Sequence, residues 1–297
     1  MTTRDDLVLG IAGLGRMGTP IAEALAHRFA VGAHDVDPAR SDAVAAVRWH
    51  PDAPALARSS DVLLTVLPGP RELRAFMTEA LPALGTGTLW IDCTSGDPSI
   101  TAELADQATQ GGVDVVSAPM GGSVSAAAAG ELTFFVSGAD EAVERALPII
   151  RTIAARDGIR RAGKRAEDGQ IVKLLANGLW FANAVAASEA MLIGRGLGLP
   201  AADLHGLLQG SAGGSRFLDE HFGRLLEGDY LTTFGVDRVV EELDTIGSMG
   251  RTVGVPTPVL DASARLHRSA LEQYGPVLGE LLAVRLLEEQ AGRRLRR

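Results

Sequence analysis

Lys173 and Asn177 are the residues whose types and spacing best fit chemistry in this sequence. They stand four positions apart in a long apolar run, so on a helix they share one face. Near a helix N-terminus and among apolar neighbours, desolvation and the helix dipole lower the pKa of a lysine toward neutrality. Such a group can exchange a proton near working pH. A lysine that extends along apolar surface, beside a satisfied core amide, is the structural alternative.

Residues 168–198, which carry this pair, predict one long helix. The run contains no proline and is apolar on nearly every face, as expected of a helix buried from several sides. Asp168 can cap its start, while Gly196, Gly198 and Pro200 mark its end. At 1.5 Å per residue the helix would extend roughly 40 Å, enough to pass from one domain into another. Charged and amide residues interrupt the run too often for a membrane span.

A glycine-rich turn near the N-terminus predicts a dinucleotide site. The apolar strand at residues 7–12 is followed by Gly13-Leu14-Gly15-Arg16-Met17-Gly18 and a helical run. In this context the first glycine permits the tight turn, the second lets backbone approach a pyrophosphate, and the third lets the helix pack on the strand. The helix N-terminus then favours the anion. A purely structural turn is the alternative.

Asp35 indicates which dinucleotide is bound. It ends the next predicted strand, at residues 29–34, where an acid can accept from both adenosine ribose hydroxyls and would repel a 2′-phosphate. We therefore expect NAD in preference to NADP. Arg40 is close enough in sequence to weaken that preference, and a plain turn residue before Pro38 is the alternative for Asp35.

The first half of the chain predicts an α/β fold with an N-terminal Rossmann-type doubly wound sheet. Strand-like runs at 61–67, 88–92, 114–117 and 133–137 alternate with helical segments that include 99–110 and 141–155. Such alternation is typical of a mostly parallel sheet with helices on both faces. Ligands bind such sheets beyond the carboxyl ends of the strands. That edge collects the glycine turn, Leu67-Pro68-Gly69, residues 92–96 and the small-residue loop 119–130.

The remainder predicts an all-α C-terminal domain, because its helical segments are separated only by glycine or proline breaks. We expect a dinucleotide-binding domain at 1–165, an interdomain helix at 166–198 and a helical substrate and dimerisation domain at 199–297. Apolar residues on several helix faces suggest contact with another subunit. The four C-terminal arginines, Arg293, Arg294, Arg296 and Arg297, are expected to form a solvated, frayed tail.

Composition excludes several classes of function. The formal charge of −9 over 297 residues makes nucleic acid an unexpected partner, and we expect no membrane partner. A single cysteine, Cys93, and a short polar N-terminus without an export signal fit a cytoplasmic protein. The six histidines lack zinc-like spacing, so no metal site is expected.

In order along the chain, these motifs resemble the β-hydroxyacid dehydrogenase family, which includes 3-hydroxyisobutyrate dehydrogenase and tartronate semialdehyde reductase. The matching segments span nearly the whole chain: the glycine turn, residues 91–98, residues 118–123 with 130–133, and Gly169-Gln170-x-x-Lys173-x-x-x-Asn177. The resemblance implies hydride transfer between nicotinamide and a hydroxyl or carbonyl carbon of a small substrate. It also implies that Lys173 is the general acid/base, that Asn177 orients it, and that the protein forms dimers or tetramers.

The resemblance and the sheet-edge argument together define the expected contacts. Cofactor contacts are expected at Gly13, Leu14, Gly15, Arg16, Met17, Gly18, Asp35, Leu67, Pro68 and Thr94. Substrate contacts are expected at Ser95, Met120, Gly121, Gly122, Ser123 and Glu241.

The chain departs from the family pattern at two places. The substrate loop has Gly121-Gly122-Ser123 where the family has Ser-Gly-Gly, so Ser123, Thr94 or Ser95 must supply the missing hydroxyl. Where the family has Lys-Asp-Leu, this chain has Glu241-Glu242-Leu243, which replaces a cation near the substrate by a carboxylate. A reversed charge in a desolvated site can be worth several kcal/mol. We therefore hypothesise a neutral or cationic substrate rather than a simple carboxylate, the alternative being that Glu241 faces solvent.

Two other functions remain open from the sequence. An imine reductase-like enzyme acting on a C=N substrate would share the glycine turn and the long helix, although such enzymes generally lack the lysine at position 173. A catalytically retired dinucleotide-binding protein would explain the altered substrate contacts.

Overall fold

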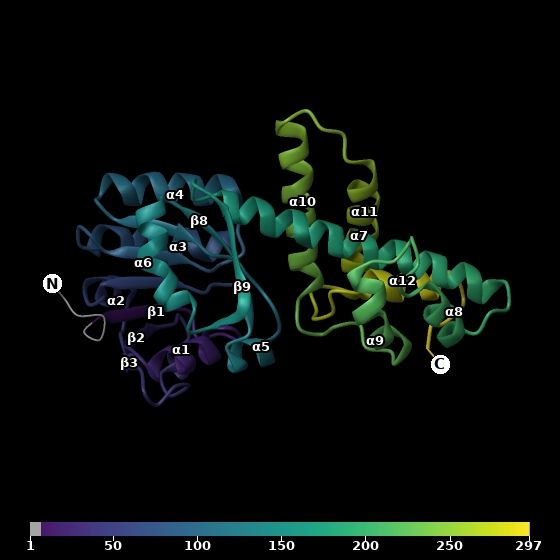
Figure 1. The fold of residues 1–297 in the computed structure, drawn as a ribbon, viewed down its shortest axis with the longest axis horizontal. Coiled ribbons are helices and arrows are strands. Elements are labelled where there is room, and N and C mark those ends of the chain that lie inside the picture. The colour runs from purple at the N-terminus through teal and green to yellow at the C-terminus, as the bar shows by residue number, and fades with distance from the viewer. Residues whose placement is uncertain (1–6, 297) are drawn as a thin grey trace. The chain divides into compact units, whose positions relative to one another are not determined.

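The computed structural model describes residues 7–296 and divides into two compact units that meet between Lys173 and Leu174. The first unit combines a sheet with helices, and the second is helical (Figure 1). The predicted fold class, a Rossmann-type sheet followed by an all-α region, is confirmed.

The first unit is built on one nine-stranded sheet in the order β3-β2-β1-β4-β5-β6-β8-β7, with β9 paired to β8. Strands β1 to β6 pair in parallel, whereas β8 is antiparallel to β6 and β7. The strands are β1 (Val8–Ala12), β2 (Ala30–His34), β3 (Arg48–Trp49), β4 (Val62–Thr65), β5 (Leu89–Asp92), β6 (Asp114–Ser117), β7 (Met120–Gly121), β8 (Leu132–Gly138) and β9 (Ala154–Gly163).

Helices cover both faces of this sheet, which explains why its central strands are continuous apolar runs. Side chains that alternate along the strands enter two hydrophobic clusters, so that Leu9 and Ile11 pack on one face and Ala12 on the other. The helices of the first cluster are α1 (Gly18–Ala26), α5 (Val124–Ala129) and α6 (Asp140–Ile150). Those of the second are α2 (Ala53–Arg58), α3 (Pro70–Ala80) and α4 (Pro98–Gln110).

The region after α6 differs from the sequence prediction. The helix predicted for residues 141–155 ends at Ile150, and the following Ala154–Gly163 forms β9. This segment, AARDGIRRAG, lacks the alternation that marks a half-buried strand, so parallel pairing with β8 decides its conformation. The predicted loop at 119–130 contains α5, which Ser123 caps and which ends at Gly130 with φ of 68°.

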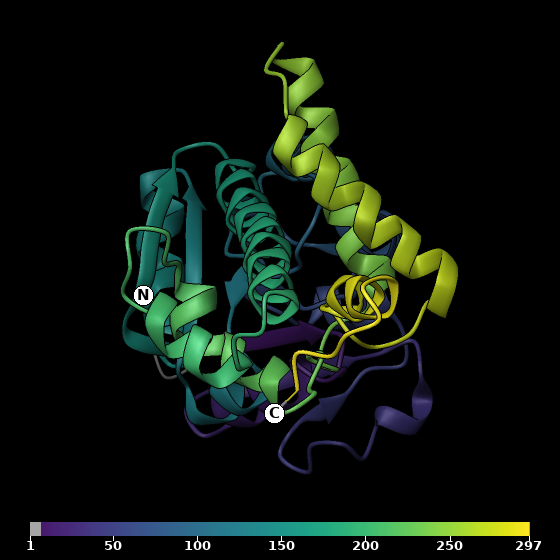
Figure 2. The same cartoon turned by 90° about the vertical axis from the view of Figure 1, so that its right-hand side faces the viewer.

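The predicted long helix is present as α7 (Asp168–Gly196), which begins in the first unit and continues into the second. Two hydrophobic clusters pack against it in the second unit, one around Phe217 and Phe222 and the other around Phe181 and Leu243. The further helices are α8 (Ala201–Leu208), a π-helical turn (Phe217–His221), α9 (Phe222–Leu226), α10 (Val236–Thr252), α11 (Pro258–Tyr274) and α12 (Leu282–Gln290). Helices α10 and α11 form a hairpin (Figures 1 and 2).

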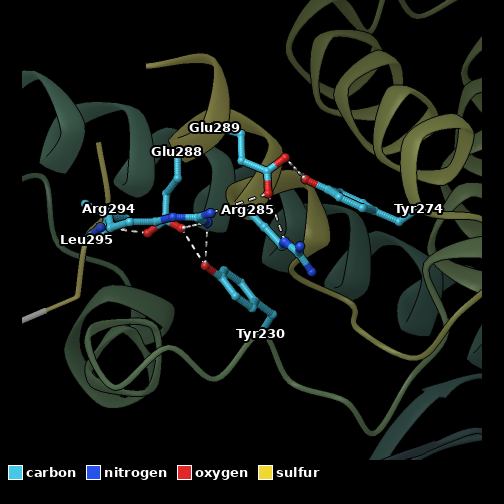
Figure 3. A network of polar contacts seen from close by, with 7 residues as sticks. All are labelled: Tyr230, Tyr274, Arg285, Glu288, Glu289, Arg294 and Leu295. Atoms are coloured by element: carbon cyan, nitrogen blue, oxygen red, sulfur yellow. Dashed lines mark hydrogen bonds and ion pairs between the residues drawn. The ribbon is translucent and has the colours of Figure 1, made fainter. Parts of the chain in front are cut away.

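The C-terminal segment is held by a buried carboxylate, contrary to the frayed tail predicted from the sequence (Figure 3). Glu288 on α12 accepts hydrogen bonds from the Tyr230 hydroxyl, from the Arg294 guanidinium at 3.2 Å and from the backbone N–H of Leu295 at 2.7 Å. Leu295 is fully buried in the helical core. The chain is therefore docked up to this residue; Arg297 lies outside the described residues.

Among the described residues, α7 alone is long and apolar enough to cross a membrane by length and composition. Only 28% of its most apolar 18-residue window is buried. Much of its apolar surface is therefore exposed in the single chain.

Candidate active site

The glycine turn joins β1 to α1 and brings Asp35 to its side. Gly13 adopts φ of 95° and its N–H donates to the His34 carbonyl at 2.9 Å. The N–H of Leu14 donates to Asp35 Oδ2 at 2.7 Å, which links the turn to the end of β2. The acid that the sequence assigned to the ribose thus lies directly at the turn.

The turn fits a dinucleotide. A Cβ on Gly13 would lie 2.4 Å from the Val66 carbonyl, and one on Gly18 would lie 1.9 Å from the Gly13 carbonyl, so both positions require glycine. A Cβ on Gly15 would meet nothing within 4 Å, which leaves room for a pyrophosphate above that backbone. Arg16 is exposed and Met17 half-buried at the start of α1. Arg40 donates to the Leu14 carbonyl at 3.4 Å, so a cation is also present near the ribose position.

The loops after β4 and β5 hold each other. The Thr94 hydroxyl accepts from the backbone N–H of Leu67 at 3.1 Å. Thr94 is buried, Ser95 is half-buried and Pro68 is exposed. The predicted cofactor contacts Leu67, Pro68 and Thr94 are therefore brought together at one sheet edge, with the Leu67 N–H already engaged by protein.

Gln170, in the first turn of α7, ties this edge to the helix that carries Lys173. Its fully buried side-chain amide donates to the Thr94 carbonyl at 2.7 Å and to the carboxylate of Asp92 at 3.3 Å. It also donates to the Ser117 hydroxyl at 3.3 Å and accepts from the Gly96 N–H at 2.9 Å. One side chain thus fixes the loop after β5 and the end of β6 against the start of α7.

Asp92 is the charged centre of this cluster, which we call the Gln170 cluster: Thr65, Asp92, Thr94, Gly96, Ser117 and Gln170. Burial raises the pKa of Asp92 to about 6, although hydrogen bonds from Thr65, Thr94 and Gln170 favour the charged form and oppose the rise. The Thr65 hydroxyl donates to Asp92 at 2.8 Å and accepts from Trp90 Nε1 at 3.0 Å. Asp92 therefore changes charge within the range of ordinary buffers.

The start of α7 also packs closely on the sheet. The Gly169 N–H donates to the Ser137 hydroxyl at 2.8 Å, and that hydroxyl donates to the Ala166 carbonyl at 2.7 Å. A Cβ on Gly169 would lie 2.5 Å from the Phe135 carbonyl. Gly169 is thus required for the helix to start where it does, one turn before Lys173.

The predicted substrate loop divides into core and surface residues. The Met120 side chain is buried in the hydrophobic core, so only its backbone is available to a ligand. A Cβ on Gly121 would meet nothing closer than 4.0 Å, and Gly122 is exposed with φ of 135°. Ser123 is exposed, and its hydroxyl accepts from the Ala126 N–H at 3.2 Å and shares a hydrogen bond with Ser125. The hydroxyl proposed to replace the family's serine is thus a helix cap.

Asn177 meets a buried carboxylate in the second unit. Its Nδ2 donates to Glu242 Oε2 on α10 at 2.7 Å, and Glu242 is 9% exposed. Lys173 is half-buried one turn earlier on α7, on the face it shares with Asn177. The structure therefore places a carboxylate directly beside one member of the predicted catalytic pair.

Glu241, the residue expected to contact substrate, is paired with Arg238 at 2.8 Å, with 42% of its side chain exposed. The predicted charge reversal at this position is therefore largely neutralised within α10. Glu242, its neighbour, is the more buried carboxylate, and the sequence argument overlooked it because only the lysine position of the family motif was compared. Gln170 and Asp92 stood in the matched motifs but were given no role.

No group of three or more histidine, cysteine, aspartate or glutamate side chains within residues 7–296 is arranged to hold a metal ion. His267 is buried, and burial lowers its pKa to about 4. A surface cavity of about 690 Å³ lies beside α6 and β9, lined in part by Leu147, Arg156 and Ile159, and holds none of the predicted site residues.

The sequence matches known families over most of its length. Residues 8–164 match the NAD binding domain of 6-phosphogluconate dehydrogenase. Residues 168–287 match the family described as NAD-binding of NADP-dependent 3-hydroxyisobutyrate dehydrogenase.

Individual relatives are dehydrogenases. The 2-(hydroxymethyl)glutarate dehydrogenase of Eubacterium barkeri is 30% identical, with 84% of this chain and 85% of the relative covered. The NAD-dependent L-serine dehydrogenase of Pseudomonas aeruginosa is 27% identical, with 89% and 92% covered.

Solved structures share the fold. The Mycobacterium tuberculosis 3-hydroxyisobutyrate dehydrogenase with L-serine aligns with a TM-score of 0.87 at 24% identity, covering 95% of this chain and 99% of that one. An imine reductase variant from Myxococcus stipitatus with NAD⁺ aligns less well, with a TM-score of 0.64 at 15% identity and coverage of 95% and 99%.

Proposed function

This chain belongs to the β-hydroxyacid dehydrogenase family of NAD-binding oxidoreductases that act on CH–OH donors, and we propose that its own substrate is a small hydroxy compound bearing a cationic group. When bound, the cofactor accepts or returns the hydride at its nicotinamide ring. The glycine turn, Asp35 and the loops after β4 and β5 would hold it. NAD is the cofactor we expect to be preferred, because Asp35 lies at the turn, and Arg40 nearby would weaken the discrimination against NADP.

In the proposed reaction Lys173 takes the proton of the substrate hydroxyl in the oxidative direction and returns it to the carbonyl oxygen in reduction. Asn177, on the same helix face, orients the substrate oxygen. Because Asn177 donates to Glu242, its side-chain nitrogen points toward α10. Glu242 thereby sets the orientation of the amide.

The single observation that carries the substrate proposal is the buried carboxylate of Glu242 beside Asn177. The family motif has a lysine at the adjoining position, whereas here that position is Glu241, which is paired with Arg238 at 2.8 Å. A carboxylate with low exposure gains from a cationic partner and opposes an anionic one. L-Serine, the molecule named with two relatives, carries an ammonium group and is one example of the proposed class.

A substrate screen tests this proposal. Purified protein with NAD is assayed with 3-hydroxyisobutyrate, L-threonate, L-serine and simple amino alcohols, and with NADH and NADPH against cyclic imines. We expect kcat/KM for the best ammonium-bearing substrate to exceed that for 3-hydroxyisobutyrate by at least tenfold, an advantage of about 1.4 kcal/mol. Turnover confined to simple hydroxy acids refutes the cationic substrate, and turnover confined to imines refutes CH–OH specificity. Tight NADH binding without any turnover identifies a retired enzyme.

We also propose that the protein acts in the cytoplasm as a homodimer or homotetramer, without a nucleic-acid or membrane partner. Its formal charge of −9 disfavours phosphate backbones. Cys93, the one cysteine in the sequence, is buried, which suits a reducing compartment.

A further inference from the structure

A surface cavity lies beside α6 and β9 of the first unit, both labelled in Figure 1. We call it the α6–β9 cavity, and its volume of about 690 Å³ is within the range of pockets that hold small molecules. All of its lining residues fall between positions 136 and 161, and none is an expected cofactor or substrate contact. A ligand in this cavity would therefore leave the glycine turn and the start of α7 free.

A large bulge in β9 forms one wall of the cavity. Between two points of pairing with β8, residues 155–158 of β9 oppose a single residue of β8. The bulge packs closely at Gly158, where a Cβ would lie 2.4 Å from the Leu132 carbonyl oxygen. Bulges redirect side chains and are frequent beside functional sites. Here the bulge brings Arg156 and Asp157 into the lining of the cavity.

The lining combines an apolar surface with two arginines that have no partner in the protein. Val143, Leu147 and Ile159 supply aliphatic side chains at the edge of the hydrophobic cluster that packs on α6. Arg151 and Arg156 are exposed, and within residues 7–296 neither side chain has a hydrogen-bond or ion-pair partner. Guanidinium groups beside an apolar surface suit a ligand that has both an apolar body and an anionic group.

Other arginines of the same region are already paired within the protein. Arg145 on α6 pairs with Asp114, and Arg161, which also lines the cavity, pairs with Asp140 at 2.9 Å. Asp157 is the one carboxylate of the lining, so arginines outnumber acidic residues there by three to one. The cavity is thus locally basic in a protein whose formal charge is −9, and this favours an anionic occupant.

We propose that the α6–β9 cavity binds a small organic anion with an aliphatic or aromatic body. The body lies on Val143, Leu147 and Ile159, and the anionic group accepts hydrogen bonds from Arg151 and Arg156. An inorganic anion would leave the apolar surface exposed to water, and an alkylammonium ion would be repelled by the arginines. The ligand differs from the proposed substrate, which carries a cationic group and is held elsewhere.

Fluorescence titration with 8-anilinonaphthalene-1-sulfonate, an anion with an aromatic body, tests this site. NAD is kept at a saturating concentration, so that the probe cannot occupy the dinucleotide site. We expect saturable binding with a Kd below about 100 μM. The double variant Arg151→Ala/Arg156→Ala should raise Kd at least about tenfold, because it removes both partners of the anionic group. Probe bound to exposed apolar residues elsewhere is common to both proteins and cancels in the comparison.

Three further variants locate the bound probe. Arg160→Ala is the matched control, because Arg160 is exposed on the same strand but does not line the cavity, and Kd should change less than about twofold. Asp157→Asn removes a repelling charge and should lower Kd about twofold to threefold. Ala155→Trp places a large side chain in the bulge and should abolish saturable binding by filling the cavity.

Competition with the bound probe identifies the class of ligand. Hexanoate and hexyl phosphate should displace it, and the stronger of the two shows whether the site prefers a carboxylate or a phosphate. Inorganic phosphate and hexylammonium should not displace it. The proposal is overturned if no saturable binding is seen with NAD present, if Arg160→Ala weakens binding as much as the double variant, or if binding survives in Ala155→Trp. Displacement by hexylammonium as strong as that by hexanoate, or by inorganic phosphate as strong as that by hexyl phosphate, would also overturn it.

Discussion

Two buried polar sites on α7, about two turns apart, are built in different ways. In the first unit, the Gln170 amide satisfies groups from the loop after β5 and from the last residue of β6, all of them near the family motifs in sequence. In the second unit, Asn177 meets Glu242, which is far along the chain on α10. The first site depends on backbone and side-chain groups at the carboxyl edge of the sheet. The second depends on the side chains of one helix.

This difference indicates which residues are constrained by the fold and which can change without loss of the fold. Loops that are fixed by a fully buried amide cannot change without leaving polar groups unpaired, which costs about 1–3 kcal/mol for each group. A side chain on α10 can change its charge while the fold persists. We therefore expect substitutions in the Gln170 cluster to alter stability, and substitutions around Glu242 to alter substrate choice.

Among substitutions that compare the two sites, Gln170→Ala is expected to have the largest effect, a loss of stability. Removing the amide leaves the Gly96 N–H and the Thr94 carbonyl without their partner, and the free energy of unfolding should fall by about 2–4 kcal/mol. Urea unfolding followed by circular dichroism measures this. Gln107→Ala, at an exposed glutamine, is the matched control and should stay within about 0.5 kcal/mol of the wild type. If both substitutions lowered the free energy of unfolding equally, the stabilising role assigned to Gln170 would be wrong.

The pH dependence of stability tests the charged centre of the same cluster. Because burial raises the pKa of folded Asp92 to about 6, the folded protein keeps a proton that the unfolded chain has already lost. The contribution of Asp92 to the free energy of unfolding therefore falls as pH rises from about 4 to about 6, by up to about 3 kcal/mol. Above that range it is constant. Asp92→Asn should remove this decline. Subtracting its unfolding curve from that of the wild type at each pH isolates the residue, and identical slopes would contradict the assignment.

In the second unit the sharper test is Glu242→Gln. Loss of the buried charge should raise KM for ammonium-bearing substrates about tenfold or more and lower the preference over 3-hydroxyisobutyrate, with little effect on unfolding. Glu241→Gln, at the neighbouring and more exposed carboxylate, should change KM less than threefold. If the two variants behave alike, the exposed glutamate rather than the buried one selects the substrate.

The smallest effect is expected at the cofactor end of the first unit. Asp35→Asn keeps an acceptor for the Leu14 N–H but removes the charge that opposes a 2′-phosphate. The ratio of Kd for NADPH to Kd for NADH should fall by about fivefold to tenfold, as measured by fluorescence titration. Asp37→Asn, on an exposed neighbour, should leave the ratio unchanged. A wild-type preference for NADPH would reverse the assignment of Asp35.

The sequence predicts the parts of this molecule that rest on local signals. Glycine spacing specified the turn at Gly13, and apolar length specified α7. Strand β9 was missed because pairing with β8, rather than its own pattern, creates it. The C-terminal segment was wrongly predicted to be frayed, because a basic tail gives no sign of the buried Glu288 that binds the backbone of Leu295. Glu242 escaped notice for the same reason, since its contact with Asn177 joins positions that no local motif connects.

The central claim is that Lys173 moves the proton while the first unit holds the dinucleotide. It is tested most directly by measuring steady-state turnover and NADH affinity of Lys173→Ala on one preparation, with the best substrate of the screen. We predict that kcat falls by about 10²–10⁴-fold while Kd for NADH changes less than threefold. A variant that keeps kcat within tenfold of the wild type would contradict the account.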